Sequence, residues 1–150
     1  MLIIKPFTWK ENKKDYKYIL NHLRKIDKLE IELSYSDVGS WIQDKHQRYR
    51  YIGYNDGVPV LLYGLYTKRH EWGNIIWCIG TDDIKKCAYS FVRKSKGQLK
   101  EWKKYGDMWN FVLSENTESI RWLTTVGACW KESVSINHHH WVRFSIKGGK

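Results

Sequence analysis

The stretch LSENTESIRWLTTVGACWKE, Leu113–Glu132, decides how this chain folds. It begins with the end of a β-rich run and continues into a short amphipathic segment that Asn116 can cap at its start. Gly127 follows that segment, in the position where glycine commonly ends a helix. A second β-rich run begins directly after it. The stretch therefore predicts a strand, a helix and another strand, which is a connection typical of mixed α/β sheets.

The composition indicates a folded and basic protein. The chain has 150 residues, a hydrophobic fraction of 42% and a formal net charge of +10. This length suits one domain, so we expect a single domain over residues 1–150. A positive balance favours nucleic acid, an anionic cofactor or an acidic protein surface as partner, although solubility alone also explains it. No apolar run approaches the ~20 residues of a membrane span, and we expect no signal peptide.

Two residue groups raise the question of thiol or metal chemistry. Cys78, Cys87 and Cys129 are scattered among apolar neighbours without CxxC spacing, which predicts buried, reduced thiols. The triple HHH at residues 138–140 stands where we expect a hairpin turn. Its first and third histidines would share one side of a strand, but no third ligand is indicated. We therefore predict an exposed turn and no metal site.

The first third of the chain reads as a strand followed by helices. LIIK, Leu2–Lys5, predicts a first strand. Thr8 and Glu11 have capping-box spacing, so a helix is expected to begin near Trp9. A second helix is expected from about Ser36 to Gln47.

The middle and end of the chain alternate between β-rich runs and helical patterns. Residues 48–66 predict a hairpin that turns at Asn55-Asp56-Gly57. Asn74–Gly80 is continuously apolar, which indicates a strand buried on both faces. A long helix is expected from about Thr81 to Tyr105, followed by a strand at Met108–Leu113. The final strands are expected in ACWKESVSI and NHHHWVRFSI, on either side of the histidine turn.

One side of the expected helix over residues 81–105 is basic. It carries Lys85, Lys86, Arg93, Lys96, Lys100, Lys103 and Lys104. A solvated face of an amphipathic helix is the default interpretation of such a pattern. The alternative is a surface that binds nucleic acid or another partner, for which Lys96, Lys100 and Lys103 are the candidate contacts.

The element order and the segment from Asn116 to Gly127 resemble the GNAT superfamily, the Gcn5-related N-acetyltransferases. Asn116, Ser119, Trp122 and Gly127 stand in the register of its motif B. The run at residues 105–132 resembles more narrowly the GNAT-like internal virion protein A of short-tailed bacteriophages. The resemblance implies a GNAT-like α/β fold, with a mixed central sheet of about seven strands flanked by about four helices. It also implies a sheet that separates near its fourth and fifth strands.

The resemblance further implies acetyl-CoA as the cofactor if the protein is active. Otherwise we expect no cofactor, with acetyl-CoA bound weakly or not at all. The residues that would hold it are Ile79, Gly80, Thr81, Asn116 and Arg121. The family binds pyrophosphate through backbone N–H groups of a glycine-rich loop, and it often uses a carboxylate near the fourth strand and a tyrosine in motif B. Here the loop reads CIGTDDIKKCA, the strand before it has no carboxylate, and Leu123 occupies the place of the tyrosine. No catalytic residue is therefore assigned.

These departures favour a bacteriophage GNAT-fold protein of reduced or lost catalytic activity, which acts in virion assembly or as an internal virion protein. Its partners would be other virion or host proteins, with nucleic acid as a further candidate, and its location the host cytoplasm or the virion. The alternative is an active acetyl-CoA-dependent N-acetyltransferase that modifies an amine of a host protein or RNA. Retention of Asn116 mildly favours the alternative, although helix capping alone explains it.

Overall fold

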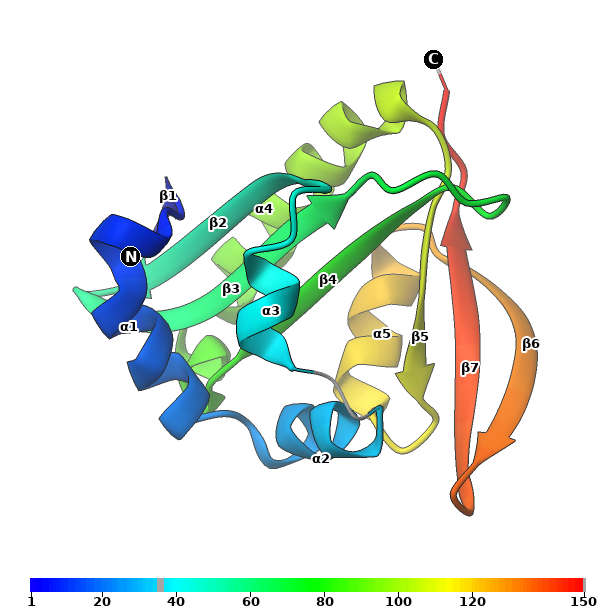
Figure 1. Ribbon diagram of the computed structural model, residues 1–150, viewed down its shortest axis with the longest axis horizontal. Helices are drawn as coiled ribbons and strands as arrows, with labels where there is room; N and C mark the ends of the chain where they lie inside the picture. The colour runs from blue at the N-terminus through cyan, green and yellow to red at the C-terminus, as the bar shows by residue number, and fades with distance from the viewer. Residues whose placement is uncertain (35–36, 150) are drawn as a thin grey trace. The chain divides into compact units, whose positions relative to one another are not determined.

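The computed structural model describes residues 1–34 and 37–149. Within them, seven strands are hydrogen-bonded in one mixed sheet, in the order β1-β2-β3-β4-β5-β7-β6 (Figure 1). The strands are β1 (Leu2–Pro6), β2 (Gln47–Asn55), β3 (Val58–Tyr66), β4 (Asn74–Gly80), β5 (Met108–Leu113), β6 (Cys129–Ile136) and β7 (His139–Ile146). The helices are α1 (Trp9–Asn21), α2 (Lys25–Leu33), α3 (Val38–Ile42), α4 (Ala88–Trp102), α5 (Thr117–Thr125) and the 3₁₀ segments η1 (Asp82–Cys87) and η2 (Lys103–Tyr105). The predicted mixed α/β class is confirmed.

The residues group into two compact units. The first comprises Met1–Tyr66 with Trp77–Phe91, and the second comprises Thr67–Ile76 with Val92–Lys150. Both β4 and α4 contribute residues to each unit. That residues 1–150 act as a single domain stays a prediction.

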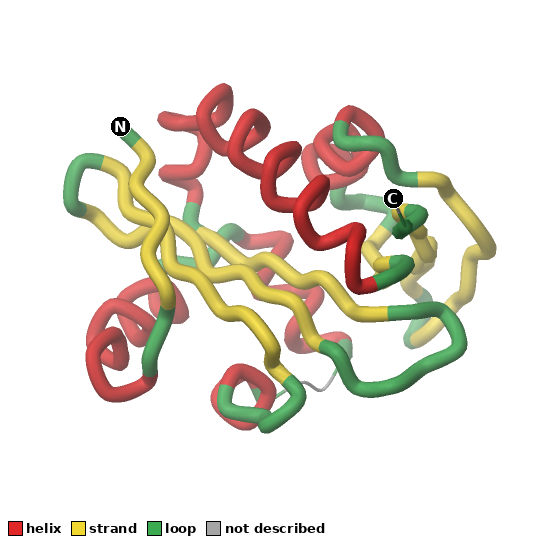
Figure 2. The backbone as a smooth tube through the Cα atoms, turned by 90° about the horizontal axis from the view of Figure 1, so that it is seen from above, coloured by secondary structure: helices red, strands yellow, loops and turns green. Residues whose placement is uncertain are grey.

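The first unit begins with two elements that the sequence predicts. The Thr8 hydroxyl accepts a hydrogen bond from the Glu11 N–H at 3.2 Å, and α1 begins directly after Thr8. The β2–β3 hairpin turns through Asp56 and Gly57, whose φ angles are 50° and 82°. Two consecutive positive φ values define the turn that matches the natural twist of a hairpin. β1 then pairs antiparallel with β2, so the hairpin gains a third strand (Figure 2).

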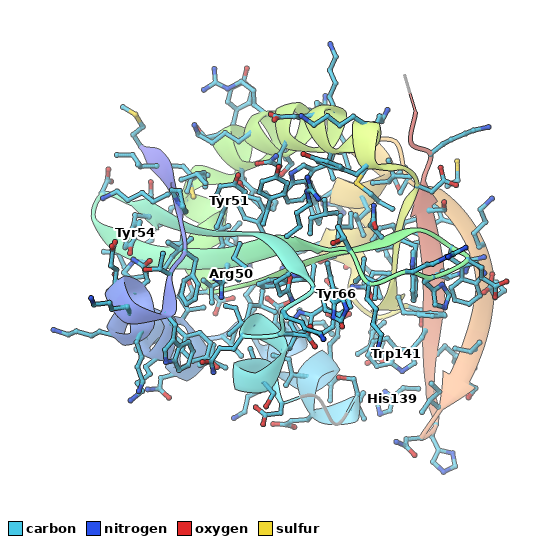
Figure 3. All side chains as sticks on the ribbon, turned by 45° about the horizontal axis from the view of Figure 1, so that its top comes forward. Arg50, Tyr51, Tyr54, Tyr66, His139 and Trp141 are labelled. Carbon is cyan, nitrogen blue, oxygen red and sulfur yellow. The ribbon has the colours of Figure 1, made fainter. Side chains whose placement is uncertain are left out.

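Apolar side chains cover both faces of the strands in the first unit. On one face, α1 and α3 pack against β2 and β3 (Figure 1). The buried members of that cluster are Phe7, Tyr16, Ile19, Ile42, Ile52 and Leu62. The second cluster joins β1 and β3 to η1, through Leu2, Val60, Leu61 and Cys87. Two side chains of β2, Arg50 and Tyr54, also hydrogen-bond to these helices (Figure 3). The Arg50 guanidinium donates to the Ile42 carbonyl in α3, and the Tyr54 hydroxyl donates to Asp15 in α1.

Three helical regions differ from the prediction. The sequence interpretation missed α2 altogether, because its N-cap residue Arg24 makes no side-chain capping bond that would mark a helix start. The expected helix over Ser36–Gln47 is wrong in length: its start at Ser36 lies outside the described residues, and α3 ends at Ile42. The chain turns there because the Asp44 carboxylate accepts the His46 N–H at 2.8 Å. The single helix expected from Thr81 is instead η1, α4 and η2 in succession.

The second unit contains the parallel strand pair that the GNAT resemblance predicts. β4 and β5 pair in parallel at Asn74↔Met108 and Ile75↔Trp109. Beyond that point the Asn110 side-chain amide donates to the Ile76 carbonyl at 2.8 Å, which replaces a backbone ladder bond. The regular pairing of the two strands therefore ends after Ile75, where the resemblance places the separation of the sheet.

The quoted stretch at residues 113–132 folds as predicted. The Asn116 side-chain oxygen accepts the Ser119 N–H at 3.2 Å and caps α5. Gly127 has a φ of 101°, and the next N–H, that of Ala128, returns to the Leu123 carbonyl at 2.9 Å. This is the hydrogen-bonding pattern with which glycine closes a helix. β6 follows and pairs with β7 through a turn at Asn137 and His138. The predicted histidine turn is confirmed for His138 only, because His139 and His140 belong to β7 and His139 is half-buried.

Candidate functional site

The predicted cofactor residues divide between the two units. Ile79, Gly80 and Thr81 are consecutive in the first unit, where β4 ends and η1 begins. Asn116 and Arg121 belong to the second unit, at the start and in the middle of α5.

The backbone N–H groups at the end of β4 already have acceptors inside the protein. In a nucleotide-binding loop these groups would point at a phosphate. Here each donates within the first unit: Gly80 to Asp27 Oδ2 at 2.9 Å, Thr81 to the Val60 carbonyl at 2.9 Å, Asp83 to Thr81 Oγ1 at 3.2 Å and Ile84 to the Thr81 carbonyl at 3.2 Å. These four groups are not available to an outside anion unless an internal bond breaks.

Asp27 is the carboxylate that holds the Gly80 N–H. It lies in the first turn of α2 and is only 4% exposed. The Arg24 guanidinium donates to both of its oxygens, at 2.8 and 3.2 Å. The Arg24 N–H also donates to the Gly80 carbonyl at 2.9 Å, so both backbone groups of Gly80 are held from α2 and its cap. A buried carboxylate is stable only when it is paired and hydrogen-bonded in this way. The three residues are called the Asp27 clamp below.

Packing and charge around Gly80, like its hydrogen bonds, disfavour the binding of an anion there. A Cβ atom at Gly80 would meet the Ile84 side chain and would lie 2.8 Å from the Val60 carbonyl oxygen. The segment that follows is a 3₁₀ helix with Asp82 and Asp83 in its first turn. Carboxylates at a helix start occupy the place where its dipole would attract an anion.

The α5 group has a structural part and an exposed part. Asn116 is 3% exposed, and its side chain is engaged in the cap of α5. Arg121 is exposed on the same helix. Leu123, at the position of the family's tyrosine, is 3% exposed and belongs to the buried residues of the second unit. A leucine donates no proton, so this position offers no general acid.

The predicted partner-binding lysines are at the surface of the second unit. Lys96 and Lys100 are exposed on α4, and Lys103 is half-buried at the start of η2. Leu99 and Trp102 anchor the opposite side of the helix, at 6% and 3% exposure. The predicted basic side of this helix therefore faces outward at Lys96 and Lys100, whereas Lys103 is partly covered.

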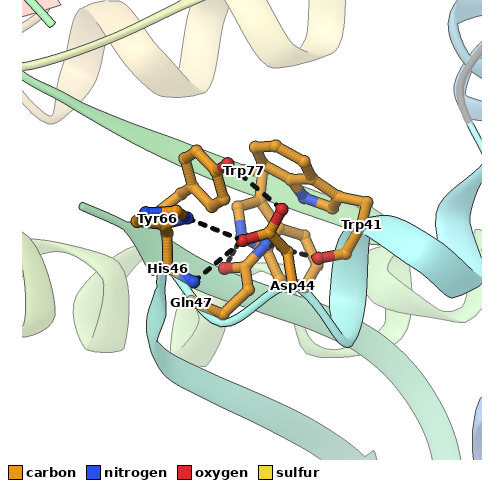
Figure 4. Close-up of polar contacts among 6 residues, drawn as sticks. All are labelled: Trp41, Asp44, His46, Gln47, Tyr66 and Trp77. Carbon is orange, nitrogen blue, oxygen red and sulfur yellow. Dashed lines mark hydrogen bonds and ion pairs between the residues drawn. The ribbon is translucent and has the colours of Figure 1, made fainter. Parts of the chain in front are cut away.

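A polar and aromatic cluster in the first unit was not predicted (Figure 4). It consists of Trp41, Asp44, His46, Gln47, Tyr66 and Trp77. Hydrogen bonds from the His46 and Tyr66 side chains reach Asp44 at 3.0 and 3.3 Å. The backbone hydrogen bond from His46, followed by its side-chain bond, holds the pKa of Asp44 below its usual value.

Three further contacts show that this cluster stabilises the connection between α3 and β2. The Trp77 indole donates to Gln47 at 2.9 Å, and the Gln47 amide donates to the Trp41 carbonyl at 3.0 Å. The Trp41 ring stacks on Tyr66 with centroids 4.2 Å apart. The short spacing from Asp44 to His46 is the one signal in the sequence that indicates this turn.

The three cysteines differ in burial. Cys87 is buried and Cys78 half-buried, but Cys129 is exposed, so the prediction of buried thiols is wrong for Cys129. Residues 1–34 and 37–149 contain no group of three His, Cys, Asp or Glu side chains arranged to hold a metal ion. None of the described helices has the length and apolar character that a membrane crossing requires.

Solved structures decide the fold. The ribosomal-protein-S18-alanine N-acetyltransferase of Escherichia coli superposes with a TM-score of 0.70 at 9% identity, over 100% of this chain and 96% of that one. A GNAT-family acetyltransferase of Streptococcus pneumoniae gives 0.65 at 7% identity, over 99% and 100%. The chain has the GNAT fold. The SpeG spermidine N-acetyltransferase of Vibrio cholerae agrees, with 0.67 at 12% identity over 97% and 93%. Identities this low establish the fold alone.

Sequence comparison adds a link to bacteriophages. The family described as "Bacteriophage T7, probable scaffold protein Gp13" matches residues 66–135. The probable scaffold protein gp13 of Escherichia phage T7 is 28% identical over 82 residues, which are 51% of this chain and 59% of the T7 protein. The chain thus matches less than two thirds of that relative. The region matched by the family includes β4, α4 and α5, but not the Asp27 end of the clamp.

Proposed function

We propose that this chain is a GNAT-fold bacteriophage protein that acts in virion assembly and has reduced or lost acetyltransferase activity. The observation that carries the proposal is the Asp27 clamp. The N–H of Gly80, at the end of β4, binds a buried carboxylate of the same chain. A pyrophosphate would have to displace that carboxylate, which also accepts two hydrogen bonds from Arg24.

The energetic consequence for cofactor binding is large. A hydrogen bond to a charged group contributes about 1.5–3 kcal/mol, and tenfold in affinity corresponds to about 1.4 kcal/mol. Loss of two such bonds weakens a micromolar site to roughly millimolar. Asp82 and Asp83 oppose an anion further, by roughly 0.3–1 kcal/mol per charge near a helix terminus.

The catalytic groups point to the same conclusion. Leu123 replaces the tyrosine that would protonate the departing thiolate, and β4 carries no carboxylate that could deprotonate an amine. The carboxylate before β4, Glu71, is exposed in the preceding loop. The pKa of Arg143 is raised mainly by its hydrogen bond to Glu132, and the charge of Glu71 adds to this effect.

The assembly role is supported by the T7 relative, which is described as a probable scaffold protein. On this proposal the partners are other virion or host proteins. The protein would work in the host cytoplasm during assembly, and as an internal virion protein it would also be part of the virion.

Two features of the structure favour an active acetyl-CoA-dependent N-acetyltransferase as the second candidate. The capped turn from Asn116 to Gly127 and the separation of β4 from β5 after Ile75 are both present. These are the parts of the fold that the resemblance connects with the cofactor. In that case the acceptor would be an amine of a host protein or RNA.

Deletion of the gene from its phage, with complementation from a plasmid, tests the proposal. We expect fewer infectious particles per infected cell, and full restoration by both the unaltered gene and an Arg121→Glu copy. Arg121 is exposed, so its reversal leaves the fold intact while it repels a cofactor phosphate. Failure of the Arg121→Glu copy alone, at an equal protein level, would favour the enzyme. Normal particle yield after deletion would refute a role in assembly.

A further inference from the structure

The outer face of α4 and η2 concentrates the positive charge of the chain. Residues 92–105 contain six basic side chains and one acidic one, which gives a net charge of +5, half of the chain's +10. The basic residues are Arg93, Lys94, Lys96, Lys100, Lys103 and Lys104. All of them except the half-buried Lys103 are exposed. This set is called the α4 basic face below.

The charges on this face are mostly uncompensated. Glu101 is the acidic residue of the segment, and it pairs with Lys104 at 3.8 Å, with both side chains more than half exposed. Among the described residues, no carboxylate lies within ion-pair distance of Lys94, Lys96 or Lys100. Exposed pairs contribute little, so the field of the face is close to the sum of its lysines.

Gly97 interrupts the side-chain cover in the middle of the face. A Cβ atom built at Gly97 would find no atom within 4 Å, so packing does not require glycine there. Glycine inside a helix destabilises it by roughly 0.5–1 kcal/mol relative to alanine. Its effect on the surface is to leave the helix backbone uncovered between Lys96 and Lys100. Another backbone can therefore approach closely at that point.

The chemistry of the face distinguishes between two kinds of acidic partner. Protein interfaces are enriched in aromatic residues and depleted in lysine at their centre. Among the described residues, no large apolar side chain is exposed between residues 92 and 105, and on α4 the exposed one is Tyr89, 81% exposed in the first turn, before the basic segment begins. Phosphate contacts to nucleic acid, by contrast, are made by Lys and Arg without an apolar core.

We infer that the α4 basic face binds the phosphate backbone of double-stranded DNA without reading its sequence. The helix rises about 1.5 Å per residue, so Arg93 and Lys104 are roughly 16 Å apart along its axis. That length matches about five base pairs, at 3.4 Å per pair along each strand. About four or five phosphates can be neutralised at once. This partner class adds to the proposed assembly role and is independent of acetyl-CoA.

The inference predicts a steep salt dependence. With about four phosphate contacts, the logarithm of the association constant falls with the logarithm of salt with a slope of about −4. Affinity for a labelled 20-base-pair duplex should drop by roughly 200-fold between 50 and 200 mM salt. Fluorescence anisotropy on the full chain measures both quantities, and duplexes of different sequence should bind alike.

Two matched triple variants locate the contact. Lys96, Lys100 and Lys103 are spaced by four and three residues, and so are Lys10, Lys14 and Lys17, which are exposed on α1. Reversal of either triple to Glu changes the net charge equally. We expect the α4 triple to weaken binding at least tenfold and to bring the slope closer to zero by 2 to 3, since about three contacts are lost. The α1 triple should weaken binding less than threefold. Circular dichroism checks that both variants fold. A second α4 variant, in which Lys94, Lys96 and Lys100 are replaced by Gln, avoids the half-buried Lys103 and should weaken DNA binding about as much as the α4 triple.

Several outcomes would overturn the inference. Equal weakening by the α4 and α1 triples would show diffuse attraction by net charge. Absence of DNA binding at 50 mM salt and micromolar protein would show that the lysines form only a solvated helix face. Binding of poly-glutamate but not of DNA through the α4 basic face would assign it to an acidic protein instead. Because none of these measurements involves particle yield, failure here is distinguishable from failure of the proposed assembly role.

Discussion

Replacement of Asp27 by Asn should destabilise the protein strongly. The carboxylate is 4% exposed, its partner Arg24 has a side chain that is 12% exposed, and together they hold both backbone groups of Gly80. An amide removes the negative charge and weakens both hydrogen bonds that the carboxylate accepts from the guanidinium. Loss of one partner of a buried ion pair costs about 3–5 kcal/mol. For a chain of this size, each kcal/mol lowers the melting temperature by about 2–4 °C, so we expect a fall of roughly 6–20 °C.

Calorimetric or circular-dichroism melting measures this effect, with Asp56→Asn as the control. Asp56 pairs with the N-terminal amine, but the two groups are 80% and 85% exposed, and Asn tolerates the positive φ of that turn. Its melting temperature should therefore hardly change. Hydrogen exchange gives a second readout, since the Gly80 amide should exchange faster in Asp27→Asn, where a neutral amide oxygen replaces its charged acceptor. Equal melting temperatures for the two variants, or an unchanged Gly80 amide, would refute the account of the clamp.

Three further changes have defined outcomes. Burial, as the largest cause, raises the pKa values of Cys78 and Tyr54 to about 12, so the folded protein keeps protons that the unfolded chain loses above about pH 9–10. Denaturant melts should therefore show stability that is fully present below pH 9 and falls as the pH rises towards 12; a flat profile would contradict this. Asn116→Ala should lower the unfolding free energy in urea by about 1 kcal/mol through loss of the α5 cap, and an unchanged unfolding free energy would contradict this role. Gly80→Ala should destabilise by about 1–3 kcal/mol because its methyl has no room, while Gly97→Ala should stabilise by about 0.5–1 kcal/mol; the same sign for both would be inconsistent with the packing described.

Local signals made most of the fold predictable. The Thr8 cap, the turn at Asp56 and Gly57 and the Asn116–Gly127 segment are each determined by residues close in sequence. Where such a signal is lacking, the prediction failed. α2 has no side-chain N-cap, and α3 ends early because a turn is built from the Asp44 side chain, which hydrophobic periodicity does not register.

The candidate site was predictable only in part. The lack of glycines after β4 is visible in the sequence and led to the expectation of weak cofactor binding. The leucine at position 123 is equally visible and led to the expectation of reduced or lost catalysis. The partner that closes the loop was not visible, because Asp27 is 53 residues from Gly80 and lies in the helix that was missed. Contacts over such separations follow from the packing of α2 against the end of β4 and leave no pattern in a single sequence.

Calorimetric titration of the purified chain with acetyl-CoA tests the central claim most directly. The account predicts no measurable heat of binding at micromolar protein, which corresponds to a dissociation constant of about 1 mM or weaker. Parallel incubation with radiolabelled acetyl-CoA and a mixture of host proteins and RNA should give no transfer above background. A micromolar dissociation constant that an Arg121→Glu variant weakens would contradict the account and establish this GNAT fold as a working acetyl-CoA site.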